Sequence, residues 1–308
     1  MPHKQPLSPG TKVGRYTIES VLAQGALGIT YRAEYNGNLF VLKAIEATDR
    51  AAGTCSSEAT AEKIDGRQST REIFESGDAT YYVMDYIAGC TLRDYVHERG
   101  RLSETEMLGL MLPVIKTMAR LDYSHLDIKP SNIIVPTDSD KYPHPVLIDF
   151  GLHIGGGREY TPCYGAPEQA AGNNRLTKAA DVYALGATML FCLTGKRPPE
   201  SGQIADEYLA RALEDVSPAT AAVIKKAVSK NPTKRHADAA ALLDDLDDDA
   251  TQIIPRDAGR KHNLSMTWIA VIAVALLALL CWLTITVASR PDYSNYLPIE
   301  EAQAESME

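Results

Sequence analysis

The sequence His-Leu-Asp-Ile-Lys-Pro-Ser-Asn at residues 125–132 decides the fold, because it places three polar side chains of complementary chemistry close together. It supplies a carboxylate (Asp127), an amine (Lys129) and an amide (Asn132), and a second acid, Asp149, follows after a short apolar run. Carboxylate and amide oxygens bind Mg²⁺, and a lysine beside them can hold a phosphate. The pattern therefore indicates phosphoryl transfer.

This stretch resembles the catalytic loop of the protein kinases, and Asp-Phe-Gly at residues 149–151 is similar to their metal-binding triplet. The family pattern His-Arg-Asp-x-Lys-x-x-x-Asn is kept except at Leu126, which stands where the family has arginine. The resemblance implies an α+β fold of two lobes, a small lobe built on an antiparallel sheet and a larger helical lobe, with ATP between them. Lys129 followed by proline and asparagine is the serine/threonine form of the loop.

The resemblance implies a role for each polar residue. Asp127 would orient the acceptor hydroxyl and take its proton, and Lys129 would steady the γ-phosphate. Asn132 and Asp149 would hold Mg²⁺, or Mn²⁺, against the phosphates of ATP. Lys43 ends an apolar run and resembles the lysine that binds the α- and β-phosphates.

Residues that would enclose ATP come earlier in the chain. Gly25 and Gly28 fall on the second and third glycines of the family's glycine-rich loop, Ala23 replaces the first, and Leu22 precedes it. Two glycines are equally typical of a plain hairpin turn, but their position before Lys43 favours the phosphate loop.

The sequence Thr-Tyr-Tyr-Val-Met-Asp-Tyr at residues 80–86 is typical of a buried strand and resembles the hinge that receives the adenine. Met84 would stand beside the purine, and Asp85 and Tyr86 would supply backbone hydrogen bonds. Any central strand could show the same pattern.

The acidic partner of Lys43 has two candidates in a predicted helix. Glu58 is preferred, because the helical pattern continues after it as far as Ile64, and Glu62 is the second choice. The two acids lie four residues apart on one face, and either could be a solvated ion-pair partner instead.

Features of the large lobe follow in the family's order. The apolar spacing over residues 92–123 predicts a core helix, and Ser103 with Glu106 predicts a capping box at its start. Ala-Pro-Glu, ending at Glu168, matches the end of an activation segment. We expect Glu168 to form a buried, structural ion pair with Arg235.

The activation segment is short, with eighteen residues between Asp149 and Glu168. It offers Tyr160 and Thr161 as phosphorylation sites. Because Leu126 replaces the arginine that anchors a phosphorylated loop, we predict that activity does not require phosphorylation.

The 308 residues, 45% hydrophobic and 23% charged, suit one sizeable domain with appendages. The net charge of −9 argues against nucleic acid as a partner, and five scattered cysteines predict neither a disulfide framework nor a zinc site. The predicted divisions are a leader (1–15), a kinase domain (16–247, with the small lobe to 86 and the large lobe from 87), a linker (248–265), a membrane helix (266–288) and a tail (289–308).

Residues 266–288 carry no formal charge and are rich in Leu, Ile, Val and Ala. A helix of this length, at about 1.5 Å per residue, crosses a hydrocarbon core of roughly 30 Å. Arg256, Arg260 and Lys261 precede it and only Arg290 follows, so we expect a single-pass cell-membrane protein with its kinase domain in the cytoplasm and a short tail outside. The predicted membrane helix and the opening sequence Pro-Gly-Thr-x-x-Gly-Arg-Tyr at residues 9–16 resemble those of the bacterial members of the family.

The function expected from the resemblance is transfer of the γ-phosphate of ATP to serine and threonine on proteins. An inactive pseudokinase that acts as a membrane-tethered scaffold is the alternative, favoured by Ala23 and Leu126 but not by the retained polar residues. A small-molecule kinase of the same fold is a weaker alternative, because residues 161–168 suit a peptide substrate.

Overall fold

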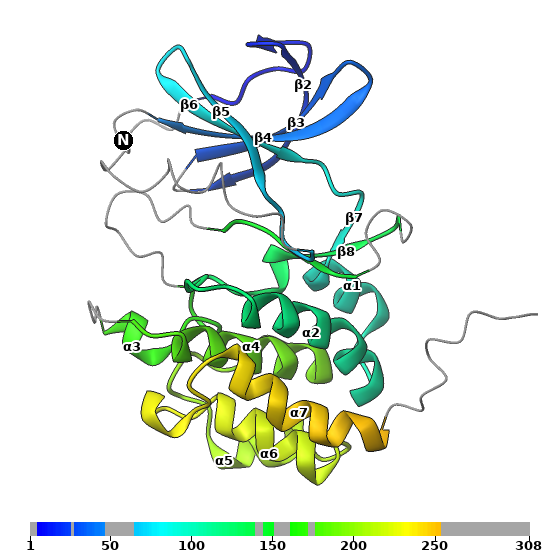
Figure 1. Ribbon diagram of the computed structural model, residues 1–308, viewed down its shortest axis with the longest axis vertical. Coiled ribbons are helices and arrows are strands. Elements are labelled where there is room, and N and C mark those ends of the chain that lie inside the picture. The colour runs from blue at the N-terminus through cyan, green and yellow to red at the C-terminus, as the bar shows by residue number, and fades with distance from the viewer. Residues whose placement is uncertain are drawn as a thin grey trace, which may run out of the picture. The chain divides into compact units, whose positions relative to one another are not determined.

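The structure of the protein, a computed structural model, describes residues 5–25, 28–46, 65–138, 144–150, 161–171 and 176–253. Within these ranges an antiparallel sheet comes first and a group of helices follows (Figure 1). The prediction of an α+β chain with a sheet lobe and a helical lobe is therefore confirmed.

The small lobe contains a six-stranded sheet in the order β1-β2-β3-β4-β6-β5, with every neighbouring pair antiparallel. Its strands are β1 (Lys12–Val13), β2 (Tyr16–Gly25), β3 (Gly28–Tyr35), β4 (Asn38–Glu46), β5 (Thr70–Ser76) and β6 (Ala79–Asp85). In β3 the buried residues Ile29, Tyr31 and Ala33 alternate with more exposed ones, so one face of this strand packs on the core. The register of β2 against β3 shifts after Ile18 and again after Val21.

The large lobe is built around α4, in which every residue except Thr194 is buried. Its helices are α1 (Leu92–Arg99), α2 (Glu104–Ala119), α3 (Pro167–Ala170), α4 (Ala179–Thr194), α5 (Asp206–Ala212), α6 (Pro218–Ala227) and α7 (Ala239–Ile253), with short 3₁₀ turns η2 (Pro130–Asn132) and η3 (Pro232–Lys234). Helix α2 packs against α4 and α7, as Figure 1 shows for α7. A helix that is apolar on all sides can only be buried, which explains the central place of α4.

The core helix predicted with a capping box at Ser103 is α2, and the apolar spacing counted from residue 92 also takes in a separate helix, α1. Helix α1 begins after Thr91, whose hydroxyl caps it, and ends at Gly100 with φ +83°. Helix α2 begins at the capping box of Ser103 and Glu106, which is confirmed. The left-handed region is open to glycine without a Cβ penalty, so Gly100 can end the first helix and redirect the chain.

A second sheet positions the catalytic stretch. Strands β7 (Gly89–Thr91), β8 (Ile133–Pro136) and β9 (Val146–Leu147) lie in this order and are antiparallel. The stretch 125–132 runs directly into β8, and Asp149 follows β9 after one residue. The amide of that residue, Ile148, donates to the carbonyl of Asn132 at 2.9 Å, which brings the two predicted metal-binding positions together.

Several predicted segments lie outside the described residues. They include Glu58 and Glu62, Tyr160, and the predicted linker end, membrane segment and tail from residue 254 onward. None of the helices in the described part of the chain has the length and apolarity needed to cross a membrane. Helix α7 continues to Ile253, past the domain end predicted at 247.

Candidate active site

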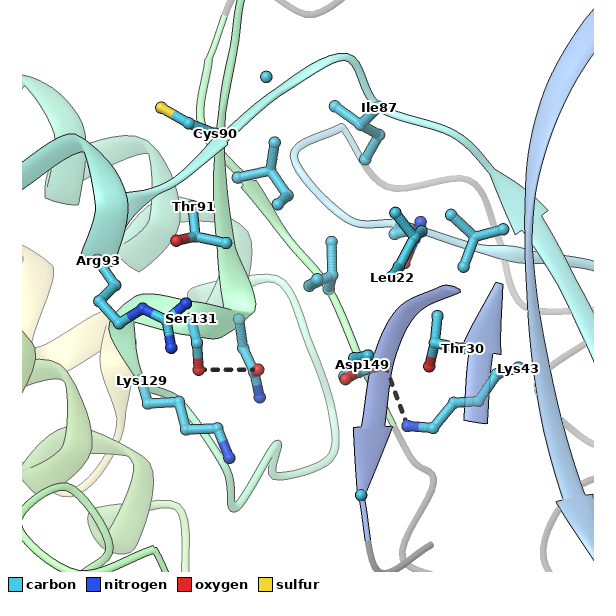
Figure 2. Close-up of a pocket in the computed structure, with 18 of the residues that line it drawn as sticks. Leu22, Thr30, Lys43, Ile87, Cys90, Thr91, Arg93, Lys129, Ser131 and Asp149 are labelled. Atoms are coloured by element: carbon cyan, nitrogen blue, oxygen red, sulfur yellow. Dashed lines mark hydrogen bonds and ion pairs between the residues drawn. The ribbon is translucent and has the colours of Figure 1, made fainter. Parts of the chain in front are cut away.

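A cavity of about 640 Å³ lies between the sheet of the small lobe and the catalytic stretch. This volume is within the range of pockets that hold a nucleotide-sized ligand. Figure 2 shows Leu22, Thr30 and Lys43 on the side of the sheet and Thr91, Arg93, Lys129 and Ser131 on the side of the helices. The predicted site residues that line it are Leu22, Gly25, Gly28, Lys43, Tyr86, Asp127, Lys129, Asn132 and Asp149.

The carboxylate of Asp127 is held from several directions. Its Oδ2 receives the ammonium of Lys129 at 2.7 Å and the amide of Asn132 at 2.9 Å. The same amide also donates to the main-chain carbonyl of Asp127 at 2.9 Å. These bonds leave Asp127 little rotational freedom, so it is oriented before any substrate arrives.

Thr161 completes this cluster, which sequence reasoning did not find. Its hydroxyl donates to Asp127 Oδ1 at 2.8 Å and lies 3.2 Å from the Lys129 ammonium. The sequence offers Thr161 as a phosphorylation site, whereas in the structure its hydroxyl is bound to the catalytic stretch itself. A hydroxyl between a carboxylate and a lysine is also the arrangement that an acceptor alcohol needs.

The other end of the cavity holds Lys43 and Asp149. The ammonium of Lys43, on β4, lies 3.2 Å from Asp149 Oδ1, as the dashed line in Figure 2 marks. Asp149 has φ +64°, which turns the chain directly after β9. Lys43 thus pairs with Asp149 in the described part of the chain, and its predicted partner Glu58 lies outside it.

The donor set at Asn132 and Asp149 suits magnesium. Mg²⁺ takes one or two carboxylates and completes its shell with water and substrate phosphates. One carboxylate and one amide oxygen on the wall of the cavity meet that need. The described residues contain no group of three or more His, Cys, Asp or Glu of the kind that encloses a metal without substrate.

The main chain before Asp127 is held by Asp181, the acid at the start of α4. Its two oxygens accept the amides of His125 at 2.8 Å and Leu126 at 2.7 Å. Asp181 is only 2% exposed. Sequence reasoning did not assign it this role, although a single acid within an apolar helix was the available signal.

The ring of Phe150 packs on His125, with centroids 4.6 Å apart. His125 is buried, and its Nε2 lies 3.0 Å from the carbonyl of Ile148. The guanidinium of Arg67 also lies over the Phe150 ring, 5.0 Å from its centroid. These contacts join the catalytic stretch to the residue that follows Asp149.

The hinge differs from the predicted arrangement. Met84 packs inside the small lobe with Ile45 and Tyr82 and does not border the cavity. The carbonyl of Asp85 accepts the side-chain amide of Gln68 at 2.9 Å, and the amide of Tyr86 donates to a β4 carbonyl at 3.4 Å. Both backbone groups expected to meet adenine therefore already have partners in the protein, and the roles of Met84, Asp85 and Tyr86 in binding ATP stay predictions.

The two glycines of the predicted phosphate loop face each other at the ends of β2 and β3. A Cβ on Gly28 would collide with the carbonyl of Ala44, and its φ is +138°. A Cβ on Gly25 would meet nothing. Within the protein itself, only position 28 therefore requires glycine.

The predicted ion pair of Arg235 and Glu168 is confirmed. The guanidinium donates to both carboxylate oxygens, at 2.7 and 2.8 Å, and the Arg235 side chain is fully buried. Further bonds run from Arg235 to the carbonyls of Ser229 and Ala179. The pair fixes α3, which contains the last two residues of the activation segment, to the large lobe.

Residues 16–246 match the family model of the protein kinase domain. The match covers well over half of the chain, and the chain therefore belongs to the protein kinase family.

Three similar relatives are bacterial. The chain is 36% identical over 210 residues to serine/threonine-protein kinase C of Synechocystis, covering 62% of this chain and 38% of that one. It is 35% identical to PknA of Nostoc (56% and 33%) and 31% identical to PknB of Mycolicibacterium smegmatis (56% and 30%). The chain thus spans about a third of the length of these curated relatives.

Among solved structures, the kinase domain of PknI from Mycobacterium tuberculosis superposes with a TM-score of 0.64 at 21% identity. The match covers 79% of this chain and 99% of that domain. At this identity the likeness establishes the two-lobed fold.

Proposed function

We propose that the chain is a protein kinase that transfers the γ-phosphate of ATP to serine and threonine hydroxyls of proteins. The observation that carries the proposal is the cluster around Asp127, where a threonine hydroxyl already lies at hydrogen-bond distance from the carboxylate and near Lys129. The named kinase relatives support the same activity.

In this mechanism the acceptor hydroxyl donates its hydrogen bond to Asp127, which takes the proton as the new bond forms. The acceptor oxygen bonds to the γ-phosphorus, the bond from that phosphorus to the β–γ bridging oxygen breaks, and ADP leaves. Lys129 steadies the transferred group, and Lys43 holds the other phosphates. Mg²⁺ or Mn²⁺, held by Asn132 and Asp149, would neutralise charge on the phosphates.

The scaffold alternative is weaker. A chain without phosphoryl transfer has no chemical need to keep Lys43, Asp127, Asn132 and Asp149, and all four are joined to one another or to Lys129 by the bonds described above. The departures at Ala23 and Leu126 remove none of these bonds.

We further propose that residues 266–288 anchor the kinase domain in the cell membrane with the N-terminal part in the cytoplasm. The uncharged length of this segment and the excess of basic residues on its N-terminal side support the proposal.

The test uses the full 308-residue chain with labelled ATP, Mg²⁺ or Mn²⁺, and a mixture of serine and threonine peptides. We expect labelled phosphoserine and phosphothreonine, a loss of about 10²- to 10⁴-fold in Asp127→Asn, and a comparable loss in Asp149→Asn. Asp215→Asn, which removes an exposed carboxylate paired with Arg101, is the matched control and should keep full activity.

Two results would contradict the proposal. A folded chain that labels nothing would favour the scaffold, and phosphorylation of a sugar or choline without labelled peptide would favour a small-molecule kinase. Separating cells that express the full chain into membrane and soluble fractions tests the anchor. Recovery of the chain in the soluble fraction would exclude it.

A further inference from the structure

The residue directly before Asp127 has an unfavourable backbone conformation. Leu126 has φ +64°, in the left-handed region. For a residue with a Cβ this conformation costs on the order of 1–2 kcal/mol. Such a conformation persists only where the surroundings hold it. The position of Asp127 therefore depends on what holds Leu126.

Two side chains from other elements bind the two polar groups of the Leu126 main chain. The amide donates to Asp181 Oδ1 at 2.7 Å, and the carbonyl accepts Nε2 of Gln169 at 2.9 Å. Gln169 is 6% exposed and lies in α3, directly after Glu168. The backbone conformation before the catalytic aspartate is thus held from both sides.

The other end of the Gln169 amide is also engaged. Its Oε1 accepts the amide of Ala166 at 2.7 Å. Ala166 offers only a donor there and the Leu126 carbonyl is only an acceptor, so the orientation of the amide is determined. Among the twenty side chains only Gln and Asn offer both an amide donor and an amide acceptor, and Asn is one methylene shorter. An ionised glutamate at position 169 would still accept the amide of Ala166, but it could not donate to the carbonyl of Leu126.

The element that carries Gln169 is itself fixed. The neighbouring Glu168 is bound by both nitrogens of the buried Arg235. Gln169 therefore extends from a fixed point towards the catalytic stretch.

We propose that Gln169 is a positioning residue that links the end of the activation segment to Leu126 and so holds Asp127 in its working position without phosphorylation. The inference rests on the proposed kinase function. Where the family has arginine in place of Leu126, a phosphorylated loop can bind that arginine. This chain lacks the arginine and has a permanent amide link at the same residue.

The experiment compares Gln169→Leu and Gln169→Glu with the wild type, in the full-length chain. We expect kcat to fall about 10- to 100-fold in both variants at pH 8, because a small displacement of a catalytic group has an effect of this size. The KM for ATP should stay within about twofold, since neither bond reaches the nucleotide. Gln203→Glu, the same change at an exposed glutamine, is the control and should behave as the wild type.

The pH dependence separates positioning from packing. Burial raises the pKa of a carboxyl group, so a glutamate at position 169 gains a proton as the pH falls from about 8 to about 6. The protonated acid can donate to the Leu126 carbonyl, and the activity of Gln169→Glu relative to the wild type should rise. Gln169→Leu cannot regain a donor, and its relative activity should stay low.

Other ionisable groups on the elements that meet at Gln169 are His125, Asp127 and Lys129 in the catalytic stretch, Asp181 on α4, and Glu168 with Arg235. They are present in all the proteins compared, and titrations common to variant and wild type cancel in the ratio of activities.

Phosphatase treatment is the second measurement. The wild type, with its dephosphorylation verified by mass spectrometry, should keep its activity. A treated enzyme that loses turnover would overturn the inference.

Each remaining outcome is also decisive. Wild-type kcat in either folded variant would overturn the proposal, as would parallel pH profiles for the two variants. A fall in melting temperature that accounts for the lost activity at both pH values would assign Gln169 to folding alone. A wild type that transfers no phosphate would contradict the proposed function instead, so the two failures are distinguishable.

Discussion

The catalytic stretch and the walls that would enclose the nucleotide are held in different ways. Around Asp127, protein groups bind both carboxylate oxygens and the main chain of the preceding residue. On the nucleotide side, Leu22 is 45% exposed and a Cβ on Gly25 would meet nothing. The polar groups around Asp127 are thus bound by the protein itself, whereas the residues named on the nucleotide side are exposed or have free space beside them.

The difference follows from what each region must do. Groups that meet the reacting atoms gain most from being oriented in advance, because reorganisation during the reaction raises the barrier. Groups that admit ATP and release ADP must let a large ligand pass. We therefore expect substitutions in the first region to affect kcat and stability, and substitutions in the second to affect KM for ATP.

The largest effect on stability is expected when the ion pair that fixes α3 is broken. Arg235→Gln leaves the Glu168 carboxylate buried without its partner, and we expect the free energy of unfolding to fall by about 3–5 kcal/mol. Arg71→Gln is the matched change in the small lobe, where Arg71 on β5 forms an exposed ion pair with Asp85 at 2.7 Å. It should cost less than about 1 kcal/mol.

Denaturant unfolding of both arginine variants measures this contrast. Equal losses of stability would show that the two regions are not held differently.

An intermediate effect is expected at Asp181. In Asp181→Asn one main-chain amide, of His125 or Leu126, faces an NH₂ group in place of an oxygen. An unpaired buried donor costs about 1–3 kcal/mol. We expect that loss in denaturant unfolding, together with a lower kcat, because one of the two bonds from position 181 that hold the main chain before Asp127 is then lost. An unchanged kcat in the folded variant would show that the amide bonds do not position Asp127.

The smallest effect is expected at Gln68, on the open side. Gln68→Ala removes the donor to the Asp85 carbonyl and leaves that oxygen free for an amino group of the ligand. A gain of about 1 kcal/mol would lower the KM for ATP about fivefold. Steady-state kinetics should show kcat unchanged, and a tenfold fall in kcat would place Gln68 with the catalytic stretch.

Much of the fold could be predicted because its signals are local. The polar residues of the catalytic stretch, the capping box at Ser103 and the alternation in the sheet are all read within a few residues. The pair of Arg235 and Glu168 is distant in sequence, but two motifs in a fixed order mark it. The apolar spacing does not mark α1 as a separate helix, because it continues across Gly100.

The rest depends on long-range hydrogen bonds that have no local pattern. Asp181 contacts residues more than fifty positions earlier, and Gln169 reaches Leu126 across forty-three. Thr161 looked like a modification site, since a hydroxyl in a short loop shows no partner in the sequence. The bond from Gln68 to Asp85 likewise joins two ordinary polar groups that only the folded sheet brings together.

Three side chains that bind the catalytic stretch, those of Thr161, Gln169 and Asp181, come later in the chain, which has a consequence for synthesis on the ribosome. A nascent chain contains Lys43, Asp127 and Asp149 before it contains Asp181, and Glu168 has no partner until Arg235 has been added. At about 5–20 residues per second, the delay between Asp127 and Arg235 is on the order of 5–20 s. In the later part of that interval Lys43, Asp127 and Asp149 are all present, but the ion pair of Glu168 with Arg235 is not yet possible. The full set of bonds around the catalytic stretch and α3 can therefore form only after Arg235 has been added.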